Sequence, residues 1–312
     1  MSAEPMNPER TSAGPILITG ASGQLGAALV KGAQAAGFAY RAVQRPAFDF
    51  DNPASIAQIC AETSPSLIIN AAAWTAVDAA ETNQDAAWRA NRDGPATLAA
   101  YAAEQHIPLI HISTDYVFDG SKGAPYIESD QVAPLGVYGA SKEAGERAVL
   151  STGAAAMVLR TAWVFSAGRA NFARTMIEAG RKRPELRVVA DQRGTPTAAP
   201  DLAAAILRIV ALIQRTGWQP RYGGIFHATN QGATTWHGFA TEIFAQAARH
   251  GETAPKIVPI TTQEWPTPVR RPADSRLDGQ KLAAVFGITL PDWRDATRRV
   301  IADMLSPPAS AP

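Results

Sequence analysis

The sequence lacks the features that mark secreted, membrane-spanning or nucleic-acid-binding proteins. It has one cysteine, Cys60, which excludes an intrachain disulfide and makes a reducing, cytoplasmic location the simplest prediction. Its longest apolar stretch, 202–213, is interrupted by Arg208 and is too short to cross a bilayer, so it predicts a buried helix and no membrane partner. Acidic and basic residues nearly balance, with a net charge of +1, which argues against a nucleic-acid-binding surface.

Short apolar runs alternate with helical patterns through the first half of the chain. The runs are continuously apolar, which is typical of a parallel sheet covered on both faces. The expected fold class is therefore α/β, with a Rossmann-type doubly wound parallel sheet. The predicted strands lie at 15–19, 38–43, 66–70, 107–112 and 156–160, and the predicted helices at 24–36, 53–62, 84–105 and 138–150.

The pattern loosens after residue 165, where prolines and glycines become frequent. We expect an NAD(P)-binding Rossmann domain over 15–165 and a smaller, irregular substrate-binding region over 166–306 that interleaves with it. Residues 1–14 are polar and lack the apolar core of a signal peptide, so they are predicted to be a flexible leader. Residues 307–312 are predicted to be a tail.

A glycine-rich turn follows the first predicted strand, with Gly20, Gly23 and Gly26 spaced three apart in ITGASGQLG. Such glycines permit a tight turn, a close approach of backbone to a diphosphate, and close packing of helix against strand. The helix that follows would direct its amide groups and positive dipole end at the phosphates. The turn therefore predicts a dinucleotide site, although a simple glycine turn before a helix is the alternative.

The end of the second predicted strand bears on the choice of cofactor. NAD sites usually place a carboxylate there for the ribose 2′-hydroxyl. This chain has Val43, Gln44 and Arg45 instead, and an arginine suits a 2′-phosphate. The segment favours NADPH over NADH, unless Arg45 is only a solvated surface residue.

Tyr138 and Lys142 are four residues apart on a predicted helix, so their side chains share one face. Reduction of a ketone needs a hydride on carbon and a proton on oxygen, and a tyrosine beside an ammonium can supply the proton. We expect the lysine to lower the pKa of the phenol from about 10 towards working pH. The alternative is a surface helix with a half-buried tyrosine.

Two hydroxyls, Ser113 and Thr114, follow the fourth predicted strand, where doubly wound folds carry their sites. Either hydroxyl could hold the carbonyl oxygen of a substrate beside Tyr138, and we favour Thr114 for catalysis. A turn or helix-cap role is the alternative for both.

Together these stretches resemble the extended short-chain dehydrogenase/reductases, and within them the dTDP-4-dehydrorhamnose reductase family. The resemblance spans about 260 residues in family order. It departs from the common pattern at Trp74, where tyrosine or histidine is expected, and at Ala162, where serine or threonine is usual. The matching segments are GASGQLG (20–26), NAAAWTAVDAAE (70–81), STDYVFDG (113–120), YGASKEAGE (138–146), LRTAWVF (159–165), DQRGTPTAAPDLA (191–203) and RRPADSRLD (270–278).

The resemblance implies reduction of dTDP-6-deoxy-L-lyxo-4-hexulose to dTDP-L-rhamnose, with NADPH as hydride donor and NADH as the alternative. Tyr138 would be the proton donor, Lys142 would tune it and bind the nicotinamide ribose, and Thr114 would assist at the carbonyl. With the motifs above, it implies a cofactor site of Gly20, Gly23, Gln24, Leu25, Gly26, Arg45, Asp49, Phe50, Ala72, Ala73, Trp74, Ser113, Tyr138 and Lys142. The implied substrate contacts are Thr114, Asp115, Trp163, Arg270 and Arg271.

Several alternatives stay open at this point. Another NAD(P)-dependent sugar-nucleotide reductase or epimerase would share the same site, and a non-catalytic subunit like that of methionine adenosyltransferase would share the fold. Trp163 could be a core aromatic, Arg270 and Arg271 a solvated charge pair, and His227 and His237 structural residues. No cluster of ligand residues in the sequence has the spacing of a metal site, and whether the protein needs Mg²⁺ is left open. A homodimer is likewise left open.

Overall fold

A six-stranded parallel sheet forms the centre of the computed structural model, which describes residues 14–306. The predicted tail, and all of the predicted leader except Gly14, lie outside the described residues. The strand order is β2-β1-β3-β4-β5-β10, so the order reverses between β1 and β3. The strands are β1 (Ile16–Thr19), β2 (Tyr40–Val43), β3 (Leu67–Asn70), β4 (Leu109–Thr114), β5 (Ala156–Thr161) and β10 (Gly224–His227).

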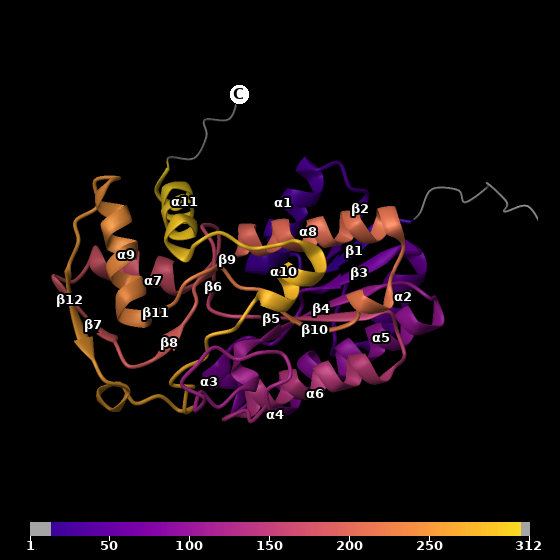
Figure 1. Ribbon diagram of the computed structural model, residues 1–312, viewed down its shortest axis with the longest axis horizontal. Helices are drawn as coiled ribbons and strands as arrows, with labels where there is room; N and C mark the ends of the chain where they lie inside the picture. The colour runs from indigo at the N-terminus through magenta and orange to yellow at the C-terminus, as the bar shows by residue number, and fades with distance from the viewer. Residues whose placement is uncertain (1–13, 307–312) are drawn as a thin grey trace, which may run out of the picture.

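Helices cover both faces of this sheet (Figure 1), because its strands are apolar on both sides. One face packs against α1 (Gln24–Ala35), α8 (Ala199–Thr216) and α10 (Gln280–Phe286), with Leu29 and Ile206 fully buried between the layers. The other face packs against α2 (Pro53–Thr63), α5 (Gly94–Glu104) and α6 (Val137–Ser151). The predicted doubly wound α/β fold is confirmed, as is the buried helix at 202–213 within α8.

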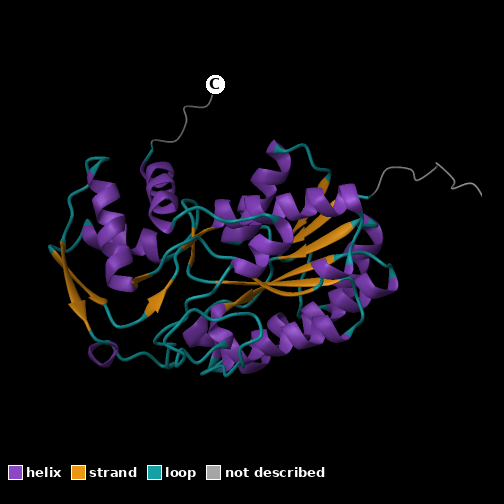
Figure 2. Cartoon of the chain, viewed as in Figure 1, coloured by secondary structure: helices purple, strands orange, loops and turns teal. Residues whose placement is uncertain are grey.

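A smaller lobe has its own apolar core around Phe239 and Trp293, and short strand pairs run along it (Figure 2). Its helices are α7 (Phe172–Gly180), α9 (Trp236–Ala248) and α11 (Trp293–Leu305). The paired strands are β12 (Lys256–Ile260) with β7 (Glu185–Val189), β11 (Thr234–Thr235) with β8 (Arg193–Gly194), and β6 (Val164–Phe165) with β9 (Thr197–Ala198).

The chain passes between the two lobes several times after residue 165. Helix α8 and strand β10 return to the central sheet, α9 and β12 belong to the smaller lobe, α10 returns again, and α11 ends in the smaller lobe. The remaining elements are short: α3 (Val77–Ala80), α4 (Gln84–Trp88), and the 3₁₀ turns η2 (Asp115–Val117), η3 (Pro220–Tyr222) and η4 (Thr262–Glu264).

The long helix predicted at 84–105 is interrupted by one π-helical segment, η1 (Arg89–Asp93), between α4 and α5. Pro95 lacks an amide hydrogen, so the regular hydrogen-bond ladder cannot run through it. Asn91 within η1 accepts a hydrogen bond from the Trp74 amide at 2.9 Å and donates to the Ser141 hydroxyl at 3.0 Å. The irregular turn thus ties the loop after β3 to helix α6.

Most element boundaries shift by only one to three residues from the predictions. The largest functional consequence is at β4, which begins at Leu109 and continues to Thr114, because Ser113 and Thr114 pair with Arg160 and Thr161 of β5. Both hydroxyl residues are therefore held in the sheet and not in a loop. In the described part of the chain, no helix has the length and apolarity needed to span a bilayer.

Candidate active site

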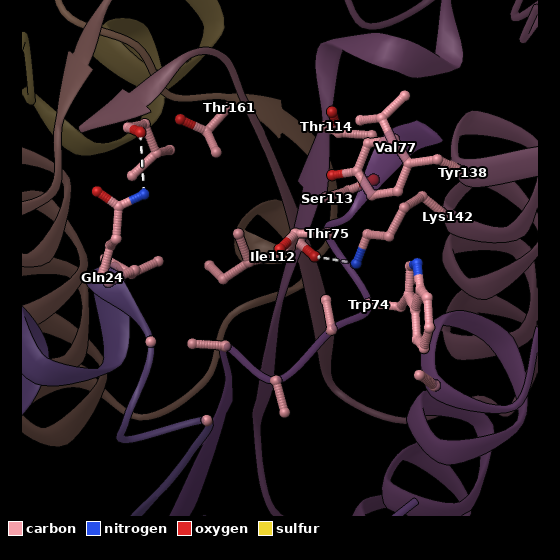
Figure 3. Close-up of a pocket in the computed structure, with 18 of the residues that line it drawn as sticks. Gln24, Trp74, Thr75, Val77, Ile112, Ser113, Thr114, Tyr138, Lys142 and Thr161 are labelled. Carbon is pink, nitrogen blue, oxygen red and sulfur yellow. Dashed lines mark hydrogen bonds between the residues drawn. The ribbon is translucent and has the colours of Figure 1, made fainter. Parts of the chain in front are cut away.

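A cavity of about 860 Å³ opens at the carboxyl ends of the central strands, beside the smaller lobe (Figure 3). That volume is within the range of sites for small molecules and cofactors. Gly26, Asp49 and Arg270 do not line the cavity. The predicted residues that line it are Gly20, Gly23, Gln24, Leu25, Arg45, Phe50, Ala72, Ala73, Trp74, Ser113, Thr114, Asp115, Tyr138, Lys142, Trp163 and Arg271.

The glycine turn between β1 and α1 has little room for side chains. Gly20 has φ +69°, and a Cβ there would lie 2.6 Å from the Ala72 amide nitrogen. At Gly26 a Cβ would lie 2.0 Å from the Gly20 carbonyl oxygen, so Gly26 packs the first turn of α1 against the loop. Among the described residues no side chain caps α1, and its first turn has no acidic residue. The free amides and positive dipole end of α1 suit an anion at this point.

The side chain of Gln24 forms two hydrogen bonds that link the two lobes. Its Nε2 donates to the Val164 carbonyl at 3.1 Å, and its Oε1 accepts from the Ser166 hydroxyl at 3.0 Å (Figure 3 shows the first bond). Only its backbone is left to meet a diphosphate.

Arg45 lies at the mouth of the cavity and is 61% exposed in its side chain, but it is paired. Its guanidinium donates to Asp49 and to Asp51, both at 2.9 Å. Asp51 also accepts from Arg89 at 2.6 Å. Two carboxylates, those of Asp49 and Asp51, thus lie beyond the end of β2 and pair with Arg45.

Tyr138 lies in the first turn of α6 and directs its hydroxyl into the cavity, beside Thr114 at the end of β4 (Figure 3). The helix begins where the Val137 amide donates to the Glu81 carboxylate at 2.7 Å. The Tyr116 ring packs edge-on against the Tyr138 ring, with centroids 5.6 Å apart. The phenol is thus fixed by its helix, its neighbour and the strand end.

The expected lowering of the Tyr138 pKa is wrong for the structure as it stands. Burial raises the pKa of this phenol well above its ordinary value, and a hydrogen bond with the Thr114 side chain offsets only part of that effect. The nearby Asp115 adds to the rise. Desolvation is the largest of these effects, and Lys142 directs its Nζ to the Ile112 carbonyl. Tyr138 is therefore held as the protonated phenol.

Lys142 is 2% exposed and lies one turn along α6 from Tyr138. Its Nζ donates to the Ile112 carbonyl at 2.7 Å and lies 3.5 Å from Nε2 of His111 (Figure 3 shows the first contact). Burial lowers the pKa of Lys142 to about 8, while the Glu146 carboxylate acts in the opposite direction. The site thus holds a tyrosine whose pKa is raised and a lysine whose pKa is lowered.

Ser113 has a role in a buried ion pair beneath the cavity. Its hydroxyl donates to Glu146 Oε1, and Arg160 binds both oxygens of the same carboxylate, at 2.9 and 2.6 Å. The Glu146 and Arg160 side chains are each 3% exposed. Because a buried charge is costly unless it is paired, this triad fixes β4, β5 and α6 relative to one another.

Trp163 has φ +47°, a left-handed backbone conformation that is rare for a bulky residue. Its indole stacks on that of Trp236 with centroids 3.5 Å apart and an interplanar angle of 7°. A Cβ at Gly194 would lie 2.4 Å from the ring of Trp163, so this glycine leaves room for the indole. The two tryptophans pack against the core of the smaller lobe and line the cavity together.

The paired arginines of the sequence separate in the structure. Arg271 lines the cavity, donating to Asp78 at 2.8 Å and to the Tyr116 hydroxyl at 3.2 Å, while Arg270 lies outside it. Asp115, at the floor of the cavity, is 2% exposed, and burial raises its pKa to about 6.

Several residues near the cavity gave no signal in the sequence. Trp236 is distant along the chain, Phe48 lies in a loop, and His111 is inside an apolar strand. Only the fold brings them to the site. His227 is buried and bonded to the Tyr126 carbonyl, away from the cavity. Within residues 14–306 no cluster of three or more metal-ligating side chains occurs.

Comparison with known proteins agrees with this geometry. Residues 14–306 match the family described as RmlD substrate binding domain. The chain is 42% identical over 296 residues to the dTDP-4-dehydrorhamnose reductase of Burkholderia thailandensis, covering 93% of this chain and 99% of the relative. Identity to the enzyme of the same name from Sinorhizobium fredii is 40%, over 93% of this chain and 97% of the relative.

Solved structures give the same answer. A dTDP-4-dehydrorhamnose reductase from Clostridium acetobutylicum has a TM-score of 0.86 at 36% identity, over 93% of this chain and 99% of that one. The Bacillus anthracis enzyme in complex with NADP has a TM-score of 0.85 at 32% identity, over 94% and 100%. A UDP-glucose 4-epimerase from Thermus thermophilus shares only the fold, at 19% identity and a TM-score of 0.76. The resemblance seen in the sequence is confirmed, and the chain belongs to the dTDP-4-dehydrorhamnose reductase family of oxidoreductases.

Proposed function

We propose that this chain reduces the C4 ketone of dTDP-6-deoxy-L-lyxo-4-hexulose to form dTDP-L-rhamnose, with NADPH as the hydride donor. One observation carries the proposal: the glycine turn, the Tyr138–Lys142 pair and Thr114 all line a single cavity. Relatives about 40% identical over most of their length carry the name of this reductase, which supports the substrate.

The residues at the switch between β1 and β3 fit a dinucleotide. The uncapped end of α1 would meet the diphosphate, and Gly20 keeps side chains out of its path. The related enzyme from Bacillus anthracis was solved with NADP, which supports the choice of cofactor. Arg45 would meet the 2′-phosphate, with Asp49 and Asp51 positioning its guanidinium. When bound, the cofactor supplies the hydride.

Tyr138 is the proton donor in this proposal. Negative charge develops on the sugar O4 as C4 is reduced, and the Tyr138 phenol has a proton available because its pKa is raised. The proton leaves Tyr138 Oη for the sugar oxygen. The Thr114 hydroxyl, now bonded to Asp115 at 3.1 Å, would turn to donate to the same oxygen.

Lys142 serves the phenolate that Tyr138 becomes. In its ammonium form Lys142 places a positive charge one helical turn away, which stabilises that anion, and burial strengthens the interaction. The lysine is anchored by the Ile112 carbonyl, so its position does not depend on the substrate.

The substrate would extend from Tyr138 towards the smaller lobe. Trp163 and Asp115 would contact the sugar nucleotide, and Arg271 is the better placed arginine for its diphosphate because Arg270 lies outside the cavity. The guanidinium of Arg271 is held by Asp78 and Tyr116, so it is oriented before the substrate arrives.

A second candidate is reduction of a related dTDP-linked ketosugar. A Streptomyces antibioticus relative, 38% identical over 93% of this chain, is named as a probable dTDP-4,6-dihydroxy-2-methyloxan-3-one 4-ketoreductase. A purely regulatory role is less well supported, because Tyr138 and Lys142 are both present and face the cavity.

The test is to incubate the purified chain with NADPH and freshly generated dTDP-6-deoxy-L-lyxo-4-hexulose and to identify the product by mass spectrometry and NMR. We expect dTDP-L-rhamnose, formed faster with NADPH than with NADH. Rapid turnover of another dTDP-ketosugar, with little of this product, would favour the second candidate. Tight NADPH binding without turnover of any ketosugar would contradict a catalytic role.

A further inference from the structure

A buried histidine, His111, contacts the lysine of the proposed catalytic pair. It lies on β4 in the middle of the sheet and is fully buried. Its Nδ1 is 3.0 Å from Nδ2 of Asn70, and its Nε2 is 3.5 Å from Nζ of Lys142. The proposed reaction assigns no task to this titratable ring.

The hydrogen bonds around Asn70 decide which ring nitrogen of His111 holds the proton. The Ala72 backbone amide donates to Asn70 Oδ1 at 3.2 Å, and the Thr19 hydroxyl is 2.7 Å from the same oxygen. A backbone amide can only donate, so this side of Asn70 is the carbonyl and the other side is the NH₂ group. Asn70 therefore donates to His111 Nδ1, which must accept. A neutral ring then carries its hydrogen on Nε2.

The ring of His111 stays neutral in this setting. Burial and the charge of Lys142 both lower its pKa well below the ordinary value. A protonated ring would also place an N–H on Nδ1 against the NH₂ of Asn70, so two donors would face each other. The Nε2–H tautomer satisfies both neighbours.

The Nε2–H of His111 is directed at Nζ of Lys142. An ammonium has three hydrogens and no lone pair, so it cannot accept this hydrogen, whereas a neutral amine can. The Ile112 carbonyl accepts one Lys142 hydrogen in either state. The contact to His111 thus favours the amine.

Other titratable or charged groups around Lys142 come from α6 and β5. Glu146 and Tyr138 lie on α6, and Arg160 of β5 binds the Glu146 carboxylate through two bonds. Ser113 of β4 donates to the same carboxylate. The Glu146 carboxylate favours the ammonium form of Lys142, but Arg160 neutralises most of the carboxylate's charge.

We propose that His111 is a positioning residue that holds a fixed Nε2–H against Lys142, so that this lysine exchanges its proton in the working pH range instead of remaining a permanent ammonium. The inference deepens the proposed function, and it rests on that function only for the link between Lys142 and turnover.

The tautomer can be measured directly, because the chain has only five histidines. Long-range ¹H–¹⁵N spectra of the protein labelled in histidine distinguish protonated from bare ring nitrogens, and the signals that vanish in His111→Gln identify His111. We expect a bare Nδ1 and a protonated Nε2 from pH 6 to pH 9. A proton on Nδ1, or an imidazolium in this range, would overturn the inference.

The effect on the lysine can be followed by NMR of ¹³Cε-labelled lysine, with Lys142→Met for assignment. The Lys142 signal should titrate near pH 8 in the parent protein. In His111→Gln the amide can turn its oxygen towards Nζ, so the midpoint should rise by about one pH unit, a tenfold change in the equilibrium. His111→Asn keeps an acceptor for Asn70 and should shift the midpoint in the same direction. His237→Gln, the same change on α9, should leave it unchanged.

Turnover separates this inference from the proposed function. The basic limb of the kcat profile should move with the lysine midpoint, upward in His111→Gln and unchanged in His237→Gln. Coincident midpoints in the parent protein and both His111 variants would overturn the inference, whether or not the chain reduces a ketosugar. Shifted midpoints without any ketosugar turnover would overturn the proposed function alone.

Discussion

Tyr138 is the residue on which the proposed chemistry depends most. Replacing it by phenylalanine removes the proton donor and leaves the ring packed against Tyr116. We expect Tyr138→Phe to lower kcat by about 10² to 10⁴-fold, the usual contribution of a general acid, with little change in the dissociation constant for NADPH. Steady-state kinetics and fluorescence titration of NADPH measure the two quantities.

Tyr101→Phe is the matched control. The Tyr101 hydroxyl donates to the Cys60 carbonyl at 3.1 Å, away from the cavity, so its loss should leave kcat unchanged. Near-normal kcat in Tyr138→Phe would rule out the phenol as the proton donor.

Arg45 tests the proposed 2′-phosphate contact. Arg45→Ala should raise the KM for NADPH more than the KM for NADH, because only NADPH carries the phosphate. The exposed position of Arg45 keeps the fold unaffected. An equal rise in both KM values would remove Arg45 from the phosphate site, and would direct attention to Arg89, which shares Asp51 with it.

For single residues, the sequence predicts contacts between side chains that are close together along the chain. Tyr138 and Lys142 are joined by helical geometry, and Thr114 by its place at a strand end. The direction of the Tyr138 pKa could not be predicted, because it depends on burial by residues distant along the chain. The tautomer of His111 could not be predicted for the same reason, since it is decided by Asn70 at the end of β3 and by Ala72 in the loop that follows.

The turn between β1 and α1 gives a prediction at the level of the element. Gly20 and Gly37 have nearly the same backbone, with φ +69° and +72°, but only Gly20 has backbone atoms within 3 Å of an added Cβ. Gly37→Ala should lower stability by about 1 kcal/mol, because alanine is strained in the left-handed backbone conformation. It should leave NADPH affinity unchanged. Gly20→Ala should cost more and weaken NADPH binding by about tenfold or more, since it displaces the loop after β3.

Thermal unfolding and NADPH titration of the two glycine variants separate backbone strain from the close approach. If Gly20→Ala bound NADPH as tightly as Gly37→Ala, the turn would not be the dinucleotide site.

Sequence periodicity located the helices and strands well but could not reveal where a regular pattern breaks. The helix expected at 84–105 is alanine-rich but contains a polar segment, Arg89–Asp93, and Pro95; η1 forms there, where Asn91 is bonded to Trp74 and Ser141. The end of β4 was placed two residues early, because the pairing of Ser113 and Thr114 with β5 is not visible in a single segment.

The stability of the whole molecule should show the cost of keeping Asp115 buried. Its pKa is about 6 when folded and near 3.8 otherwise, so the folded state binds this proton more tightly and stability falls as pH rises from 4 through 6. Asp115→Asn removes the charge and should raise the free energy of unfolding at pH 7.5 by up to about 3 kcal/mol. The melting temperature should rise accordingly. The gain should vanish below pH 4.

For Asp119, four residues further along the chain, we expect the opposite dependence of stability on pH. The Ser121 amide and hydroxyl lower its pKa, so its contribution to stability is present above pH 4 and lost as pH falls. Asp119→Asn should therefore be less stable than the parent protein at pH 7.5. Thermal unfolding of both variants from pH 3.5 to 8 provides the comparison, and a loss of stability in Asp115→Asn at pH 7.5 would show that the charge of Asp115 is not a cost.

At the scale of the molecule, the alternation of strands and helices predicts the sheet and the edge of it that carries the site. It does not reveal how the chain after residue 165 divides between two cores. Trp236 stacks on Trp163 against the core of the smaller lobe, although α8 and β10, which pack in the central sheet, lie between them in the sequence. The stated domain boundaries, like the individual ligand contacts, stay predictions.

The central claim is that this cavity transfers a hydride from NADPH to C4 of a dTDP-ketosugar. The most direct test supplies NADPH deuterated at either position of nicotinamide C4, with dTDP-6-deoxy-L-lyxo-4-hexulose, and analyses the sugar by mass spectrometry and NMR. The account predicts one deuterium at sugar C4 from one of the two labelled cofactors, and none in Tyr138→Phe over the same time. NADPH oxidation that leaves sugar C4 unlabelled with both cofactors would contradict it.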